Sequence, residues 1–220
     1  MDPSAQSAQV FDQLAALYQS KYMDLDLYDE SYALLARPLP QQARVLDAAC
    51  GPGTVARRLM AWRPDLQLLG VDLAPRMVEL ARVAVPAARF EVGDCRRLPG
   101  EDGSWDAIVC AFGLPYLSPA EARDFIAQAG RLLAPGGLLY LSTQGGRPED
   151  SGPQRSSRGD VVHVFFHAME GPESVGAWLA AADLQRVAQG AFPSPVDAPA
   201  KTSDWFGIAR KSAGRVLTGE

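Results

Sequence analysis

Acidic residues follow three successive apolar segments of this chain, at positions where a ligand could be bound. Asp47 precedes the stretch AACGPG, Asp72 ends LLGVD and Asp94 ends FEVGD. Carboxylates accept hydrogen bonds from ribose hydroxyls and amino groups, and they pair with cations. These three aspartates are therefore the first candidates for a binding site.

A glycine-rich stretch follows the first of these acids. Gly51, Gly53 and Ala56 have the spacing G-x-G-x-x-A, which occurs in dinucleotide-binding loops. A pyrophosphate would bind at the N-terminus of the next helix, and Asp47, four residues before Gly51, would repel it. The same carboxylate favours a ligand with an ammonium group and a sulfonium centre, which is what S-adenosylmethionine carries.

The elements that must position these residues follow from the hydrophobic pattern. From residue 44, short apolar segments alternate with longer amphipathic ones: ARVLDAA, TVARRLMAW, LQLLGVD, PRMVELARVAV, ARFEVGD, WDAIVCAF, PAEARDFIAQAGRLL and GGLLYLST. Such alternation predicts a doubly wound α/β fold, a parallel sheet with helices on both faces. Ligands of these folds bind at the carboxyl ends of the strands, where all three aspartates are expected.

The flanking segments complete the predicted organisation of one domain over residues 1–220. Residues 1–40 should form two cap helices, the first with Val10, Leu14, Leu17 and Tyr18 on one stripe and the second from about 29 to 37. Residues 44–143 form the cofactor-binding core, and residues 144–170 form a polar loop and an acceptor-side segment. Residues 171–211 supply a helix and the last two strands.

Composition narrows the class of partner. The 220 residues have a net charge of −5, from 21 basic and 26 acidic residues, without a dense basic run. This argues against nucleic acid or an anionic membrane and favours a small molecule. No apolar run approaches the roughly 20 residues of a membrane span, and no signal-peptide pattern opens the sequence, so we expect a cytoplasmic protein, monomeric or homodimeric.

Cys50, Cys95 and Cys110 are an odd number without C-x-x-C spacing. The pattern predicts neither a disulfide framework nor a metal site. Reduced, apolar side chains are expected, although all three lie near predicted strand ends.

Five motifs resemble a known family. VLDAACGPGT, LLGVDLAPRMVELA, FEVGDCRRLP, WDAIVCAFGLPYLSP and RLLAPGGLLYLST are similar, in order and spacing, to the successive motifs of the class I S-adenosylmethionine-dependent methyltransferases. The tail with DWFGIARK is similar to the last two strands of that fold, and YQSKYMDLDLYDESY resembles a bacterial small-molecule branch. The resemblance implies a Rossmann-like, mainly parallel seven-stranded sheet with an antiparallel last strand. It also implies methyl transfer to an unidentified small-molecule acceptor.

The resemblance assigns expected roles to individual residues around the donor. It places the methionine moiety on the loop after the first strand, the ribose on Asp72 and the adenine amino group on Asp94. The other residues would line the methionine, adenine or sulfonium, or close over the cofactor. The expected donor-site residues are Tyr22, Asp47, Ala49, Cys50, Gly51, Gly53, Asp72, Leu73, Met77, Asp94, Cys95, Ala111 and Phe112.

A general base is needed only if the acceptor arrives protonated. The two histidines, His163 and His167, both lie in VVHVFFHAM and share a face whether that stretch is extended or helical. His167 is the preferred base candidate because it follows the loop expected to cover the donor. Tyr116, after the fourth strand, is a further candidate. The alternative is that His167 is a turn or helix-start residue and His163 a surface side chain.

Two other functions remain open from the sequence. A non-catalytic module could bind S-adenosylmethionine or S-adenosylhomocysteine without transferring a methyl group. An NAD(P)-dependent oxidoreductase is less compatible, because none of the lysines, Lys21, Lys201 and Lys211, lies four residues after a tyrosine.

Overall fold

A computed structural model describes residues 2–155, 159–193 and 203–213. Within these residues, seven strands form one sheet in the order β3-β2-β1-β4-β5-β9-β8. The first five run parallel to one another, and β9 runs antiparallel to both of its neighbours. The predicted sheet with an antiparallel last strand is therefore confirmed. The strands are β1 (Arg44–Ala48), β2 (Gln67–Asp72), β3 (Arg89–Val92), β4 (Trp105–Ala111), β5 (Leu133–Gln144), β8 (Leu184–Pro193) and β9 (Ser203–Lys211).

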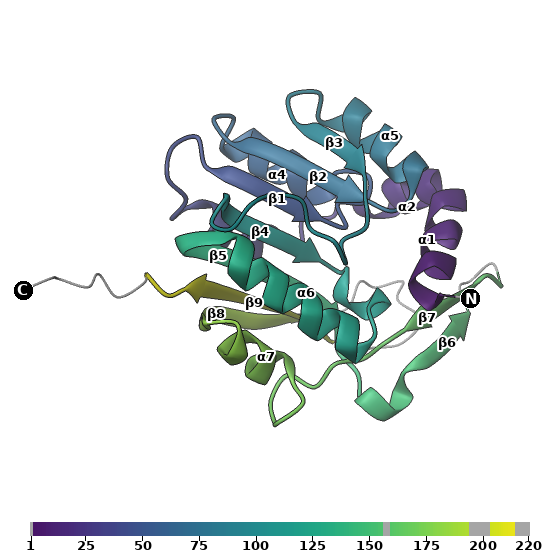
Figure 1. Cartoon of the computed structure of the whole chain (residues 1–220). Helices are drawn as coiled ribbons and strands as arrows, with labels where there is room; N and C mark the ends of the chain where they lie inside the picture. Colours follow the sequence, from purple (N-terminus) through teal and green to yellow (C-terminus); the bar gives the residue numbers. More distant parts are fainter. Residues whose placement is uncertain (1, 156–158, 194–202, 214–220) are drawn as a thin grey trace, which may run out of the picture.

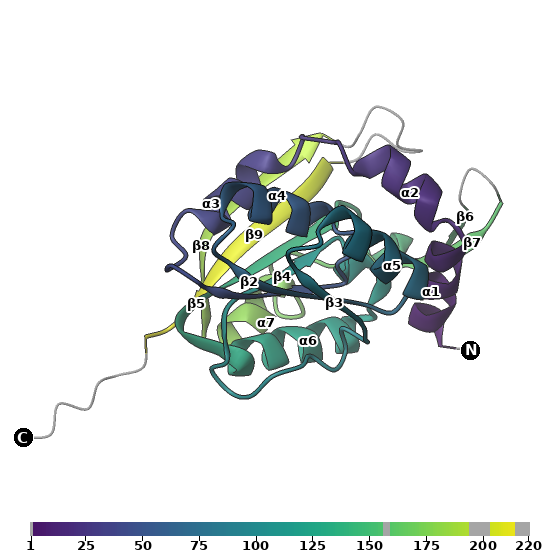
Figure 2. The same ribbon diagram turned by 90° about the horizontal axis from the view of Figure 1, so that it is seen from above.

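Helices cover both faces of the sheet, as the alternating pattern predicts (Figure 2). The helices are α1 (Pro3–Gln13), α2 (Ala15–Tyr22), α3 (Asp29–Ala36), α4 (Thr54–Trp62), α5 (Pro75–Ala84), α6 (Pro119–Leu132) and α7 (Val175–Ala181). Leu35 of α3, Leu59 of α4 and Val78 of α5 share one buried cluster with the sheet. Phe125 of α6 and Trp178 of α7 belong to a second cluster on the other face. Burial on both faces explains why β1 and β4 are almost continuously apolar.

The helix ends follow from local sequence. Pro75 begins α5 because its fixed backbone angle suits a first turn, where no hydrogen-bonded amide is needed. Ser118 caps α6 in a reciprocal pair with Glu121, which satisfies free amides of the first turn. These caps fix where α5 and α6 begin, in the segments that follow the strand ends at which the site forms.

The N-terminal cap differs from the prediction of one first helix. The chain leaves helical geometry at Leu14, which ends α1 and precedes α2. Both helices contact α5, and the break lets α1 also reach β7. Both lie at the end toward which the arrows of the parallel strands point (Figure 1). They therefore cover the edge where the ligand site was predicted.

The segment after β5 also differs from the predicted loop. Its described residues contain a short 3₁₀ helix, Pro148–Asp150, and strand β6 (Gly152–Arg155), which pairs antiparallel with β7 (Val161–Val164). VVHVFFHAM is thus extended at its start, one of the two predicted options. A two-stranded ribbon is only marginally stable alone, and packing against α1 supports this one. Within the described residues, no helix is long and apolar enough to cross a membrane.

Candidate donor site

A cavity that is partly open to solvent lies at the carboxyl ends of the parallel strands. Its wall combines the loops after β1, β2, β3 and β4 with α1 and α2. The lining residues are Ser4, Ser7, Ala8, Phe11, Tyr18, Ala49, Gly51, Asp72, Leu73, Met77, Gly93, Asp94, Cys95, Arg96, Ala111, Phe112, Gly113, Tyr116 and Leu117.

The loop after β1 forms one wall through unusual backbone geometry. Ala49, Gly51 and Gly53 all have positive φ, at +63°, +53° and +88°. Phe112 after β4 also has positive φ, at +56°. Non-glycine residues rarely adopt this conformation, and such strain is concentrated at functional sites. Of the four non-glycine residues with positive φ in the described part of the chain, Ala49 and Phe112 line the cavity, whereas Gln42 and Asp183 do not.

Asp72 joins the first two loops. Its Oδ2 accepts a hydrogen bond of 2.8 Å from the backbone N–H of Gly51, and its Oδ1 accepts one of 2.9 Å from Ala74. Burial raises the pKa of Asp72, and these hydrogen bonds oppose the rise. Each oxygen keeps lone-pair capacity toward the cavity, so the carboxylate could still accept ribose hydroxyls.

Asp47 is fully buried on β1, directly before the strained loop. Among the described residues, neither of its carboxylate oxygens has a hydrogen-bond partner. Burial, and secondly the charge of Asp72, raise the pKa of Asp47 to about 7. Asp47 does not itself line the cavity, whereas Ala49 does. A buried carboxylate without a partner is costly, so it favours a cation nearby.

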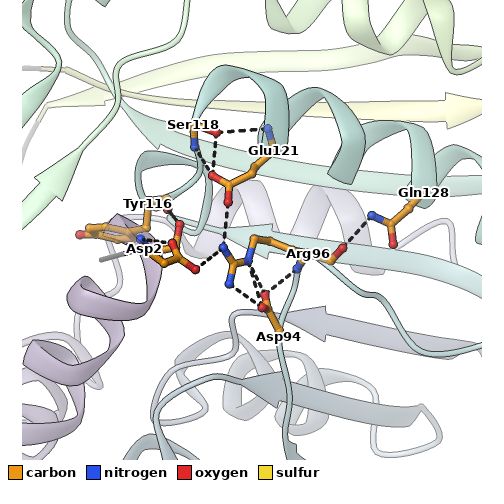
Figure 3. A network of polar contacts seen from close by, with 8 residues as sticks. Asp2, Asp94, Arg96, Tyr116, Ser118, Glu121 and Gln128 are labelled. Carbon is orange, nitrogen blue, oxygen red and sulfur yellow. Dashed lines mark hydrogen bonds and ion pairs between the residues drawn. The ribbon is translucent and has the colours of Figure 1, made fainter.

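Asp94 follows β3 and is held by Arg96. The Nε of Arg96 donates to both carboxylate oxygens at 3.0 Å, and Nη2 donates to Oδ2 at 2.8 Å (Figure 3). Burial would raise the pKa of Asp94, but the hydrogen bonds and charge of Arg96 lower it below its usual value. The carboxylate is therefore ionised and fixed in orientation at the cavity wall.

Aromatic side chains close the cavity beneath the N-terminal helices. Phe11 contacts Tyr18 and Tyr116 edge to face, with ring centroids 5.9 Å and 4.8 Å apart. Burial raises the pKa of the Tyr116 hydroxyl well above its usual value, so the phenol stays neutral. The hydroxyl can donate or accept a hydrogen bond but is not a phenolate base at neutral pH.

Neither predicted histidine lines the cavity in the described part of the chain. His167 is buried, its Nε2 donates to the Leu114 carbonyl at 3.0 Å, and its ring packs edge to face on Trp178. His163 is on β7, where its backbone N–H donates to Ser7 Oγ and its ring packs on Phe165. The shared face predicted for the two rings does not bring either one to the donor cavity.

The cysteines occupy apolar surroundings. Cys50 and Cys110 are buried, and Cys95 is partly buried in the cavity wall. Burial raises the pKa of Cys95 to about 12 and that of the other two well above the usual thiol value. All three are therefore neutral thiols, which fits the predicted reduced apolar side chains.

The structure gathers most of the predicted residues on one wall and leaves some outside it. The predicted residues that line the cavity are Ala49, Gly51, Asp72, Leu73, Met77, Asp94, Cys95, Ala111, Phe112 and Tyr116. Those that do not line it are Tyr22, Asp47, Cys50, Gly53, His163 and His167. The ring of Tyr22 packs on that of the cavity-lining Tyr18, with ring centroids 4.6 Å apart.

Several lining residues were missed by the sequence analysis. Ser4, Ser7 and Phe11 come from α1, whose pattern predicts a helix but not what it covers. Arg96 was also missed, although a basic residue two positions after Asp94 is a signal that could have been found. In the segment 144–170, expected at the acceptor side, β7 packs on α1, and none of the described residues of this segment lines the cavity.

This arrangement defines a Rossmann-like protein with an acid-rich ligand cavity at its strand ends. Residues 45–137 match the family model of the methyltransferase domain. A demethylmenaquinone methyltransferase of Deinococcus radiodurans is 42% identical over 102 residues, which are 44% of this chain and 42% of that relative. This match supports the class I S-adenosylmethionine-dependent methyltransferase family for these residues, and the chain spans less than half the length of that curated relative.

Solved structures share the fold along almost the whole chain. The [4+2]-cyclase SpnF has a TM-score of 0.71 at 19% identity, with 96% of this chain and 97% of that chain covered. A 1,6-didemethyltoxoflavin-N1-methyltransferase of Burkholderia thailandensis, crystallised with S-adenosylhomocysteine, has a TM-score of 0.69 at 22% identity. That match covers 94% of this chain and 88% of the other. At these identities the likeness establishes the fold.

Proposed function

We propose that this chain binds S-adenosylmethionine in the cavity and transfers its methyl group to a small molecule. The observation that supports this most directly is the convergence of the strained loop, Asp72 and Asp94 on one cavity. A nucleoside linked to an amino acid needs hydrogen-bond acceptors for its ribose and its base, and a backbone loop for its amino-acid end. The wall supplies all three.

The buried carboxylate of Asp47 fits the positive charge of this ligand. It has no hydrogen-bond partner among the described residues and immediately precedes the loop. The ammonium group of the donor would stabilise the ionised form of Asp47, either by direct electrostatic attraction or through a bridging water. A dinucleotide would instead place a pyrophosphate near this acid, which is unfavourable.

In the proposed complex Asp72 holds the ribose hydroxyls and Asp94 accepts from the adenine amino group. Leu73 and Met77 contact the adenine faces, and Ala111 and Phe112 line the reacting side. The bound donor supplies an activated methyl group on a sulfonium, so the protein's task is to align the acceptor and exclude water. Phe11, Tyr18 and Tyr116 exclude water from that side of the cavity.

We propose Tyr116, and neither histidine, as the residue that orients the acceptor. Tyr116 lines the cavity and its hydroxyl is neutral, whereas His167 is buried against Trp178 and the Leu114 carbonyl. The aromatic wall supports an acceptor with an apolar or aromatic part. The demethylmenaquinone and 1,6-didemethyltoxoflavin named for the relatives above also support a small-molecule acceptor.

Binding and transfer are tested separately. Thermal unfolding is followed with S-adenosylmethionine, S-adenosylhomocysteine and NADH, since a ligand at 100 times its Kd adds about 2.7 kcal/mol of stability. Stabilisation by NADH alone would overturn the proposal. Transfer is then sought with radiolabelled donor and a panel of metabolites.

A donor-binding module without methyl transfer is the second candidate. It is supported by the cyclase with the same fold, which shows that the architecture serves other chemistry. Tight binding of both adenosyl compounds with no transfer across a broad acceptor panel would favour it. One domain over residues 1–220, a cytoplasmic location and a monomeric or homodimeric state remain predictions.

A further inference from the structure

Helix α1 and its N-cap are hydrogen-bonded to the segments that follow four different strands of the seven-stranded sheet. Ser4 Oγ donates to the Tyr116 carbonyl after β4, at 2.7 Å. Ser7 Oγ accepts from the backbone N–H of His163 after β5, at 3.2 Å. Asp12 accepts from the backbone N–H of Arg76 in α5, after β2, at 2.7 Å. The fourth tie, after β3, is made through Arg96.

Arg96 joins three carboxylates from separate parts of the chain (Figure 3). Its Nη1 donates to Asp2 Oδ2 at 2.7 Å and to Glu121 Oε1 at 2.8 Å, while Nε and Nη2 hold Asp94. Asp2 caps α1, Glu121 is in the first turn of α6, and Asp94 is in the donor-cavity wall. The Arg96 side chain is only 24% exposed. One guanidinium therefore opposes three negative charges.

We propose that Arg96 is a positioning residue that couples the orientation of Asp94 in the donor site to the closure of α1 over the bound donor. The inference rests on the proposed function, because it assumes that the donor occupies this cavity. Asp2 and Asp94 share one arginine, so the side chain that holds α1 in place also holds the adenine-binding carboxylate in place. Without Arg96, three carboxylates repel one another and Asp2 pushes α1 away from the rim.

Asp2→Asn separates this role from helix capping. Asp2 Oδ1 accepts from the backbone N–H of Ser4, and asparagine caps a helix as well as aspartate does. The substitution removes the charge that faces Arg96 and leaves the Arg96–Asp94 pair intact. Because Asp2 and Arg96 are partly exposed, we expect an increase of about threefold in the dissociation rate of S-adenosylhomocysteine.

Arg96→Gln removes both halves of the coupling. We expect its dissociation rate for S-adenosylhomocysteine to rise by about tenfold or more, since charged hydrogen bonds on both sides are lost. In this background Asp2→Asn should slow dissociation or leave it unchanged, because it now removes a repulsion. The sign of the Asp2→Asn effect therefore depends on Arg96, which independent structural damage would not produce.

The experiment measures dissociation by chasing labelled S-adenosylhomocysteine from the full chain, without an N-terminal tag, and follows hydrogen exchange of α1 amides. Arg131→Gln is the matched control, since it removes an ion pair with Asp102 from the same helix, α6, away from the cavity. The control should keep the unmodified dissociation rate and α1 protection, while both single variants of the coupled pair lose α1 protection.

The possible failures are distinguishable. If the unmodified chain binds neither adenosyl compound, the proposed function is wrong and the coupling is wrong with it. If the unmodified chain binds but Asp2→Asn changes neither dissociation nor α1 exchange, only the coupling is overturned. The same holds if Asp2→Asn accelerates dissociation equally with and without Arg96.

Discussion

The Oδ2 of Asp72, at the end of β2, accepts a 2.8 Å hydrogen bond from the backbone N–H of Gly51, in the loop after β1. This bond connects the predicted ribose-binding acid to the predicted amino-acid-binding loop, although the two residues are far apart in the sequence. The cavity wall is therefore a connected unit in which a change at one loop affects the other.

Asp47→Asn should stabilise the ligand-free protein at pH 8 and weaken donor binding. The pKa of the Asp47 carboxyl is near its usual 3.8 in the unfolded chain and about 7 in the folded protein, so the native state binds the extra proton between these pH values. The Asp47 contribution to stability therefore falls as pH rises from about 4 to 7 and is constant above. In thermal and urea unfolding, the free energy of unfolding of the variant should exceed that of the unmodified protein by on the order of 3 kcal/mol at pH 8, with no difference at pH 4. Equal stability of both proteins at pH 8 would contradict this.

Donor binding should strengthen as pH rises through 7. The ammonium of S-adenosylhomocysteine stabilises ionised Asp47 and lowers its pKa from about 7, so binding at pH 6.5 releases protons. Titration calorimetry in buffers of different ionisation enthalpy measures that release directly. Asp47→Asn is the control and should bind weakly with no such proton release. Unchanged affinity between pH 6 and pH 8 would remove Asp47 from the donor site.

Gly51→Ala and Gly53→Ala should separate binding from stability. Both glycines have positive φ, so each alanine is strained by about 1 kcal/mol or more. A Cβ at Gly53 would lie 3.3 Å from Ala81, whereas a Cβ at Gly51 meets no atom within 4 Å and Gly51 lines the cavity. Gly53→Ala should lower the melting temperature more, and Gly51→Ala should raise the Kd for S-adenosylhomocysteine more, by about tenfold for a steric cost of 1–3 kcal/mol. If Gly53→Ala raised the Kd more than Gly51→Ala does, the ligand would bind elsewhere.

Tyr116→Phe should impair use of the acceptor without affecting the donor. The ring keeps its contact with Phe11, and only the hydroxyl of this cavity-lining residue is lost. One hydrogen bond to the acceptor changes kcat/KM by up to about tenfold. Steady-state kinetics with an identified acceptor measures the effect on the acceptor, and the Kd of S-adenosylhomocysteine measures the effect on the donor. A weaker donor Kd with unchanged acceptor kinetics would assign the hydroxyl to the donor.

His167→Phe should alter the acid stability of the protein and leave turnover of the folded protein intact. Burial lowers the pKa of His167 in the folded state, while the hydrogen bond to Leu114 opposes the shift. The unfolded state therefore takes up the proton first, and the His167 contribution to stability decreases as pH falls below about 6.5. Unfolding midpoints between pH 5 and pH 8 should show this loss in the unmodified protein and less of it in the variant. A loss of turnover at full folding would restore His167 as the base.

The order of strands and helices could be predicted because buried strands are continuously apolar, whereas the helices that cover them are amphipathic. The acids were predictable for a related reason, since residues such as Asp72 and Asp94 end apolar segments and parallel strands end at one edge. The roles of individual side chains were less predictable. Arg96 was not recognised because its partners, Asp2 and Glu121, come from elements far apart in the sequence.

By itself, the sequence determined the sheet, the position of the glycine-rich loop and the acids at the strand ends, because these depend on local pattern and spacing. Only the tertiary structure decided what covers the site. The packing of α1 against β7 places Ser4, Ser7 and Phe11 on the cavity side of the ribbon and leaves both histidines outside the wall. Which face of a short amphipathic helix meets which loop depends on the sum of long-range contacts, and no local pattern encodes that sum.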